Sequence, residues 1–445
     1  MHERTERAVA RALFVLLCAC PTSLTLVAIL VSVTPWYGDY QRHRFERELS
    51  ARIGVGVEIE AIEKPAPGMI RLVGLVLTEP ETGLEVGRVR LATWTRADSK
   101  TVIRLSQPEV KSERLRDVWR VIHDRFLCQP ELTRHAVRVA ADDVTIHSRS
   151  GSTTLRDVDA WLRPEERRVE ATLQCVPAGR RDDAPVHVRV IRDRGGEFAT
   201  TEWTLLTGGL TLPCSALGEY LPVLDRLGPE ATFAGTLRWK VSDAGWSIDL
   251  GGSRFDEVEL SDLMEDVPHR LTGRASVAFQ RGQLDPKKAI DISGTLTAAS
   301  GYLGWSLVRA ASEHLGFEVA SPEDPDAKDL AYDRIGLRFD LFGPRLTLAG
   351  ICHQQRGLEY LSPGVIVTSG GYGVVGSGGE PRSWASLVRT FWQDGRESLP
   401  ASTQSGWLMS WLPAPKLSAP VSAAPPRITG TGSYRGVGAI RPPQP

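Results

Sequence analysis

The chain has 445 residues, which is enough for about two or three ordinary domains. Its composition, with 42% hydrophobic and 24% charged residues, is that of a folded protein and excludes a largely disordered or collagen-like chain. The 53 basic and 54 acidic residues leave a net charge of -1, so no overall field attracts nucleic acid. We therefore predict no nucleic-acid partner.

The first feature along the chain is an uncharged apolar run over residues 12–34. A helix needs about 20 apolar residues to cross the hydrocarbon of a bilayer, because every backbone polar group must be satisfied internally there. The run predicts a transmembrane anchor, preceded by a short cytoplasmic tail (1–11). The alternative is a cleaved signal peptide, whose apolar core is typically only about 7–15 residues long. Pro21 predicts a kink, with neighbouring hydroxyls bonding to the freed carbonyl groups.

An amphipathic helix is expected directly after the anchor, over residues 35–54. Phe45, Leu49 and Ile53 recur at a spacing of four and form its apolar side. Six of its residues are candidates for a membrane interface, since aromatic and basic side chains gather where a chain leaves a bilayer. They are Trp36, Tyr37, Tyr40, Arg42, Arg44 and Arg47. Ordinary flanking charges are the alternative interpretation for the three arginines.

The hydrophobic pattern of residues 55–410 predicts one β-rich body, which we expect to lie outside the cytoplasm. The hydrophobic period changes to two at Val55 and returns in short runs as far as residue 351, with turn signals such as Pro65–Gly68 between them. Helical spacing interrupts the pattern at residues 113–127, 303–315 and 383–392. The fold class that fits is mainly β, an extended antiparallel sheet carrying a few helices. Residues 411–445 are rich in Pro, Ser, Ala and Gly and predict a mostly disordered tail, with one edge strand as an option at 428–434.

No motif predicts an enzyme. The Gly371–Gly376 segment matches G-x-G-x-x-G but lacks the βαβ context of a dinucleotide site, so we interpret it as a turn between strands. The histidines show no metal-ligand spacing, and His123 and His314 are expected to be surface or packing residues. We predict no catalytic residues, cofactors or metal ligands. Cys128, Cys175, Cys214 and Cys352 either form one or two disulfides or remain buried thiols.

The order of features resembles the AsmA-like proteins of bacterial envelopes. The resemblance lies in the anchor, the exit helix, the strands opening on Val57–Glu60 and Gly74–Pro80, and a later block at Ile335–Leu341, Leu346–Gly350 and Gly371–Gly373. It implies a single-pass protein of the bacterial inner membrane, with a periplasm-facing β-groove lined by alternate apolar side chains.

The function that this resemblance implies is lipid handling or envelope assembly, with lipid and envelope proteins as partners. Two alternatives stay open. The first is an anchored interaction module whose apolar faces close on each other as a filled core, and the second is an exported hydrolase with a site assembled from distant residues.

Overall fold

The computed structural model describes residues 13–32, 34–80, 82–97, 100–129, 135–148, 151–178, 185–215, 222–243, 245–285, 290–320 and 327–391, with residues 9 and 288. The chain divides into two units, Met1–Pro413 and Ala414–Pro445. The second unit, with the whole predicted tail at 411–445, lies outside the described residues. So does the predicted cytoplasmic tail, apart from residue 9.

The apolar N-terminal segment is helical over residues 13–32. A π-helix, η1 (Val15–Ala19), leads into α2 (Cys20–Ser32), which has 13 residues. The Thr22 hydroxyl donates a hydrogen bond to the carbonyl oxygen of Cys18, four residues before it. Within the described part of the chain, no helix is both long and apolar enough to cross a membrane. The predicted transmembrane helix at 12–34 is thus not found as one helix, because the apolar run is divided between η1 and α2.

The next helix, α3 (Pro35–Ile53), begins with proline at its first position and ends at Gly54. Gly54 has φ +87°, and its amide donates to the Ser50 carbonyl at 2.7 Å. Leu49 on this helix is buried against β1 (Gly56–Ala66) and β2 (Met69–Thr78), with Phe45 and Ile53 partly buried beside it. The side chains that face the sheet are those that the spacing of four predicts.

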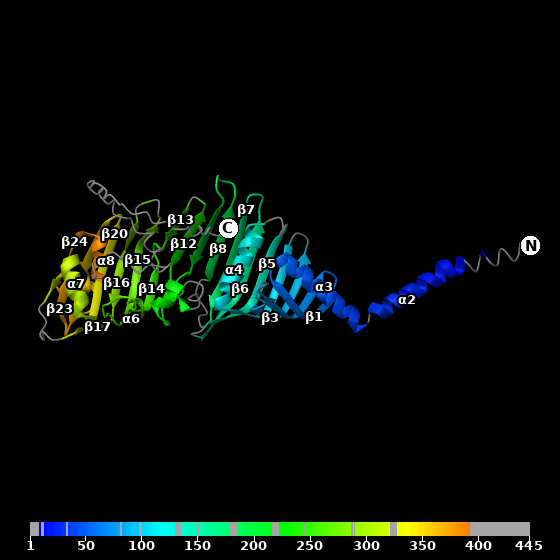
Figure 1. Cartoon of the computed structure of the whole chain (residues 1–445), viewed down its shortest axis with the longest axis horizontal. Coiled ribbons are helices and arrows are strands. Elements are labelled where there is room, and N and C mark those ends of the chain that lie inside the picture. The colour runs from blue at the N-terminus through cyan, green and yellow to red at the C-terminus, as the bar shows by residue number, and fades with distance from the viewer. Residues whose placement is uncertain are drawn as a thin grey trace, which may run out of the picture. The chain divides into compact units, whose positions relative to one another are not determined.

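The strands make the structure mainly β, as predicted, and all but two of them belong to one 22-stranded sheet. The strands from β3 to β9 are β3 (Glu85–Ala97), β4 (Lys100–Lys111), β5 (Ala136–Ser148), β6 (Gly151–Pro164), β7 (Arg168–Pro177), β8 (Val186–Asp193) and β9 (Thr200–Leu206). Strands β1 to β9 pair in chain order, and β9 then pairs with β12. Figure 1 shows this succession.

The second half of the sheet is built from strands of 2 to 11 residues. They are β10 (Leu212–Pro213), β11 (Thr232–Ala234), β12 (Thr236–Ser242), β13 (Gly245–Asp249), β14 (Arg254–Glu259), β15 (Arg274–Leu284), β16 (Asp291–Ala298), β18 (Glu318–Val319), β20 (Arg334–Phe342), β21 (Arg345–Gly350), β22 (Val365–Ser369), β23 (Tyr372–Gly376) and β24 (Gly378–Ser383). A separate two-stranded sheet joins β17 (Gly301–Gly304) to β19 (Asp329–Tyr332). The Gly371–Gly376 motif begins in the β22–β23 turn, as predicted, but most of it forms the strand β23 rather than a turn.

One pairing departs from the predicted antiparallel sheet, because β4 and β5 run parallel. Parallel neighbours need a crossover connection, and here it is helical. The crossover consists of a 3₁₀ turn, η2 (Ser112–Arg114), then α4 (Leu115–Val121), then a π-helix, η3 (Ile122–Leu127). The sequence predicts the helix at 113–127 but misses β4, whose alternation is broken by Pro108 and by Gln107 at φ +50°.

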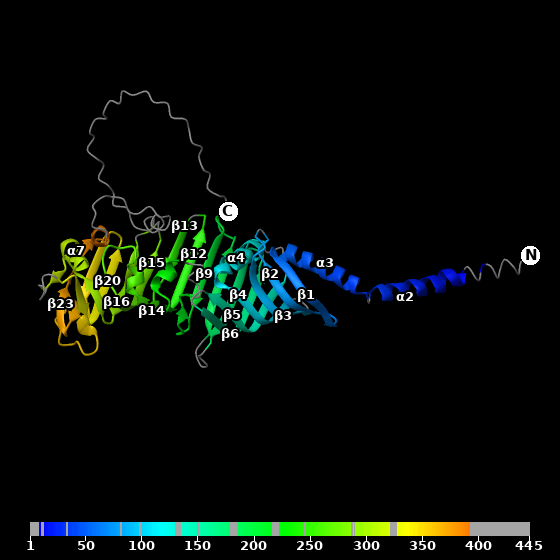
Figure 2. The ribbon, with the colours of Figure 1, turned by 60° about the horizontal axis from the view of Figure 1, so that its bottom comes forward.

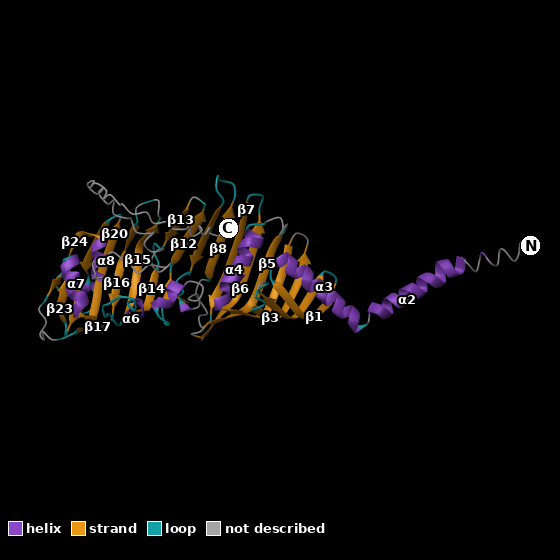
Figure 3. Ribbon diagram, viewed as in Figure 1, coloured by secondary structure: helices purple, strands orange, loops and turns teal. Residues whose placement is uncertain are grey.

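Helices pack against one side of the sheet. Figures 2 and 3 show α3, α4 and α7 (Trp305–Leu315) on this side. The last helix, α8 (Trp384–Phe391), lies against α7, and both occur where the sequence predicts helices. The shorter helical turns are α6 (Leu260–Leu263), η5 (Pro222–Leu227) and η6 (Cys352–Gln354).

Candidate functional site: the apolar face of the sheet

The side of the sheet that the helices touch carries a continuous row of apolar side chains. Each of β2 to β9 and β12 contributes one residue, and each residue is the direct cross-strand partner of the next. The row is Ile70, Trp94, Ile103, Val139, Ala160, Leu173, Val188, Leu205 and Leu237. All of its members are only partly buried. The sheet therefore presents an apolar strip that the rest of the described structure does not fully cover.

A second apolar row runs beside the first, two residues along each strand. It consists of Val137, Leu162, Ala171, Val190, Trp203, Trp239 and Ile248, one from each of β5 to β9, β12 and β13. Successive side chains of a strand point to opposite faces, so these two rows share one face. Together they widen the apolar strip.

The opposite face of the same strands is mainly polar. Its corresponding row is Val102, Arg138, Trp161, Thr172, Arg189, Thr204 and Arg238. Trp161 in this row is covered by cations, with the guanidinium carbons of Arg138 and Arg163 at 5.2 and 5.1 Å from its ring centroid. Arg138 also donates to Asp159 at 2.8 Å. One face of the sheet is thus mainly apolar and the other mainly polar.

Aromatic rings continue the apolar face toward the C-terminal strands. Phe279 on β15 and Phe339 on β20 meet edge to face, with ring centroids 5.9 Å apart. Gly294 on β16 stands between them in the pairing register. A Cβ atom at Gly294 would approach Phe339 Cζ to 2.8 Å, so the ring contact depends on glycine.

Two helical segments cover parts of this face. The indole of Trp119 on α4 contacts that of Trp203, with ring centroids 3.7 Å apart. Leu127, at the end of η3, is fully buried with Val169 and Val190. At the N-terminal end α3 covers Val57, Ile59 and Leu72. The first apolar row therefore begins on strands that α3 covers and continues on strands that η3 covers.

A cavity of about 420 Å³ opens between α3 and strands β1 and β2. Phe45, Ile62 and Ile70 give it an apolar side, while its polar side carries charges of both signs, from Arg42 and Lys64 and from Asp39 and Glu60. Ile70 is also the first member of the apolar row. The cavity thus connects one end of the strip to the helix nearest the N-terminal apolar segment.

The six residues predicted at a membrane interface all lie on α3. Trp36 and Tyr40 stack, with centroids 6.2 Å apart, and both are exposed. Arg44 and Arg47 are exposed too, and helical spacing sets these four on the side opposite Leu49.

The other two predicted interface residues differ in their surroundings. Tyr37 is partly exposed. Arg42 turns toward the sheet, donating to the Glu60 carbonyl at 3.1 Å and pairing with Asp39 at 3.3 Å.

The described cysteines are all free thiols, which decides between the two predicted states. Cys175, Cys214 and Cys352 are buried, and burial raises the pKa of each thiol to about 11. A high pKa keeps a thiol protonated and unreactive at neutral pH. These three act as small apolar side chains of the core.

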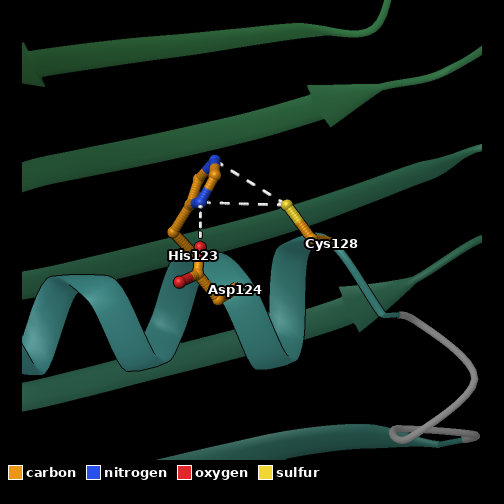
Figure 4. Close-up of side chains that lie close together, drawn as sticks. All are labelled: His123, Asp124 and Cys128. Carbon is orange, nitrogen blue, oxygen red and sulfur yellow. Dashed lines mark hydrogen bonds and ion pairs between the residues drawn. The ribbon is translucent and has the colours of Figure 1, made fainter. Parts of the chain in front are cut away.

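Cys128 differs from them, because it lies beside His123 and Asp124 (Figure 4). Its Sγ is 3.8 Å from both ring nitrogens of His123, and Nδ1 of His123 is 2.8 Å from a carboxylate oxygen of Asp124. The potential ligand atoms of the three residues lie within 4.8 Å of one another. Partial burial raises the pKa of the Cys128 thiol, against the opposing charges of Arg192 and Arg194.

Comparisons with protein-family models, with curated proteins and with solved structures find no match to this chain.

Proposed function

We propose that this protein is a membrane-anchored, non-enzymatic protein of the bacterial cell envelope that holds lipid acyl chains against the apolar face of its sheet. The observation that carries the proposal is the apolar row from Ile70 to Leu237, every member of which stays partly exposed. Exposed apolar surface is unfavourable in water by about 25 cal/mol per Å². An acyl chain laid along the row would remove that cost.

The dimensions of the row suit a lipid. Neighbouring strands lie about 4.8 Å apart, so the row from β2 to β12 extends over about 38 Å. The hydrocarbon core of a bilayer is about 30 Å thick and is filled by two leaflets, so one acyl chain of about 15 Å would cover a little under half of the row. The polar opposite face, with its Arg138–Asp159 ion pair, would remain in water.

The N-terminal segment supports attachment to a membrane. Its apolar side chains are exposed, with Phe14 at 66% and Leu16 and Leu24 at 71%. Residues 13–32 are helical throughout, and the exposed side of α3 carries Trp36, Tyr40, Arg44 and Arg47. We place this segment in the inner membrane and the sheet in the periplasm, following the resemblance to AsmA-like proteins. The cavity at Ile70 would then be the end of the strip nearest the bilayer.

The competing proposal is an anchored module with a filled β-core that binds proteins. A filled core of packed sheets needs a second large sheet over the apolar face. The described strands instead form one 22-stranded sheet and one two-stranded sheet. This arrangement favours the lipid-binding surface.

Photo-crosslinking from matched positions on the two faces tests the proposal. Benzoylphenylalanine is introduced into the full chain at Leu173 or Val139 on the apolar face, and at their sequence neighbours Thr172 or Ala140 on the other face. After irradiation of membranes, mass spectrometry should find phospholipid adducts at Leu173 and Val139 and not at Thr172 and Ala140. Equal lipid labelling from both faces would contradict the proposal, and protein adducts at Leu173 would favour the interaction module.

A further inference from the structure

The end of the crossover helix adopts a π-helical turn where an α-helix would ordinarily continue. In η3 the amide of Cys128 donates to the carbonyl of His123 at 2.8 Å, a bond between residues five apart. In an α-helix, residues five apart point about 140° away from each other. The π-turn brings them to the same side. Short π-helical segments within helices occur frequently at functional sites.

The turn assembles three side chains of different ligand type. His123 supplies an imidazole nitrogen, Asp124 a carboxylate oxygen and Cys128 a thiol sulfur. A tetrahedral zinc ion has bonds of about 2.0 Å to nitrogen and oxygen and about 2.3 Å to sulfur, which sets a nitrogen and an oxygen ligand about 3.3 Å apart and a nitrogen and a sulfur ligand about 3.5 Å apart. Sγ of Cys128 lies 3.8 Å from each ring nitrogen of His123, a few tenths of an ångström beyond that separation, so a small rotation of the imidazole would bring one nitrogen into place. The hydrogen bond from His123 to Asp124 would open by a few tenths of an ångström to admit the ion.

We propose that His123, Asp124 and Cys128 form a three-ligand site for a divalent transition-metal ion of the zinc type. Three protein ligands leave the fourth position of a tetrahedral ion for water or another small ligand. The two anionic ligands balance the charge of the ion once the thiol has lost its proton. The site lies at the end of the helix that packs on the apolar face through Trp119 and Leu127. A bound ion would therefore also hold this helix end in its π-turn.

The sequence alone does not reveal this site. Metal-binding histidines and cysteines on an α-helix are sought three or four residues apart, whereas His123 and Cys128 are five apart. Residues five apart lie on the same side of a helix only where it makes a π-turn, so only such a turn lets His123 and Cys128 bind the same ion.

The test is a titration of the full chain with Co²⁺ after removal of bound metal by a chelator. Binding should give one ion per chain and the intense charge-transfer absorption of a cobalt–thiolate bond. C128A should abolish that absorption. H123A and D124N should each weaken binding by at least the roughly 10–100-fold that loss of an outer contact costs. Zn²⁺ should displace Co²⁺ from the site.

The control variants are H147A and D143N, which remove an exposed histidine and an exposed aspartate from β5, and C18S/C20S, which removes the thiols of the apolar N-terminal segment. All should bind Co²⁺ as the parent chain does. Circular dichroism of every variant separates loss of a ligand from loss of the fold. Binding that is far below one ion per folded chain, or that persists unchanged in C128A, would overturn the proposal.

Discussion

At the scale of single residues, the apolar face depends on where side chains are small as much as on where they are large. Gly294 lies between Phe279 and Phe339 in three paired strands, and its lack of a side chain lets the two rings meet. A Cβ atom there would also press on the Ala278 carbonyl oxygen, which belongs to the neighbouring backbone and cannot rotate away. Edge-to-face ring pairs contribute about 0.5–1.5 kcal/mol beyond their burial.

Gly294→Ala should therefore destabilise the sheet, even though alanine ordinarily favours order by restricting the unfolded chain. Overpacking of this kind costs about 1–3 kcal/mol. Gly378→Ala on β24 is the matched control, because a Cβ atom at that position meets nothing within 4 Å. Urea unfolding followed by tryptophan fluorescence should show a lower midpoint for Gly294→Ala and an unchanged or slightly higher one for Gly378→Ala. Equal midpoints would show that the Phe279–Phe339 contact does not depend on glycine.

At the scale of elements, an ion-pair cluster fastens the crossover helix to the end of β2. Glu79 follows β2 directly, and its carboxylate lies 3.4 Å from Arg114 and 2.6 Å from Arg120. The Thr82 hydroxyl donates to the same carboxylate at 2.8 Å. The hydrogen bonds from Thr82 and Arg120 hold the pKa of Glu79 below its usual value, with the charges of Arg120 and Arg114 adding to the effect.

This lowered pKa gives the attachment of α4 a pH dependence of known sign. A carboxyl group whose pKa is lower in the folded than in the unfolded state stabilises the fold above its unfolded pKa, about 4.3 for glutamate, and loses that contribution as the pH falls through the folded value. E79Q should unfold at a lower temperature than the parent chain at pH 7, and the difference should shrink below about pH 4. Hydrogen exchange at residues 115–127 should be faster in E79Q at pH 7. Unchanged hydrogen exchange at residues 115–127 would show that Glu79 does not help to hold α4 on the sheet.

At the scale of the whole molecule, the helical segment of residues 13–32 and the helix α3 that follows it lie in different environments. On α3, Leu49 is buried on the sheet with Phe45 and Ile53 partly buried beside it, whereas the segment before α3 exposes ten large apolar side chains among its described residues between Leu13 and Leu30. A contiguous exposed apolar surface of this kind marks an interaction with a membrane or another protein. The proposed anchor accounts for it.

Deletion of residues 13–32 should release the protein from membranes. Fractionation of expressing bacteria should find the parent chain in the membrane pellet after an alkaline carbonate wash, and the deleted chain in the wash or the soluble fraction. Deletion of residues 414–445, which form the second unit, is the matched control and should leave the chain in the pellet. A parent chain that the carbonate wash removes would contradict an integral anchor.

The sequence by itself determined the local elements of this protein. Alternating side chains mark most strands, and helical spacing marks α3, the crossover helix, α7 and α8, because these periods follow from local backbone geometry. The sequence missed β4, where Pro108 interrupts the pattern, and also β9 and β14, and it predicted one helix over residues 12–34 that the structure divides between η1 and α2.

Only the tertiary structure decided which residues meet. The apolar row needs the register of strands from Ile70 to Leu237, and a shift of one residue in any pair would break it. The parallel β4–β5 pairing, the free state of Cys128, Cys175, Cys214 and Cys352, and the contact of Cys128 with His123 depend in the same way on chain paths and on a π-turn. Periodicity describes each element alone, whereas these features arise from how the elements are placed against one another.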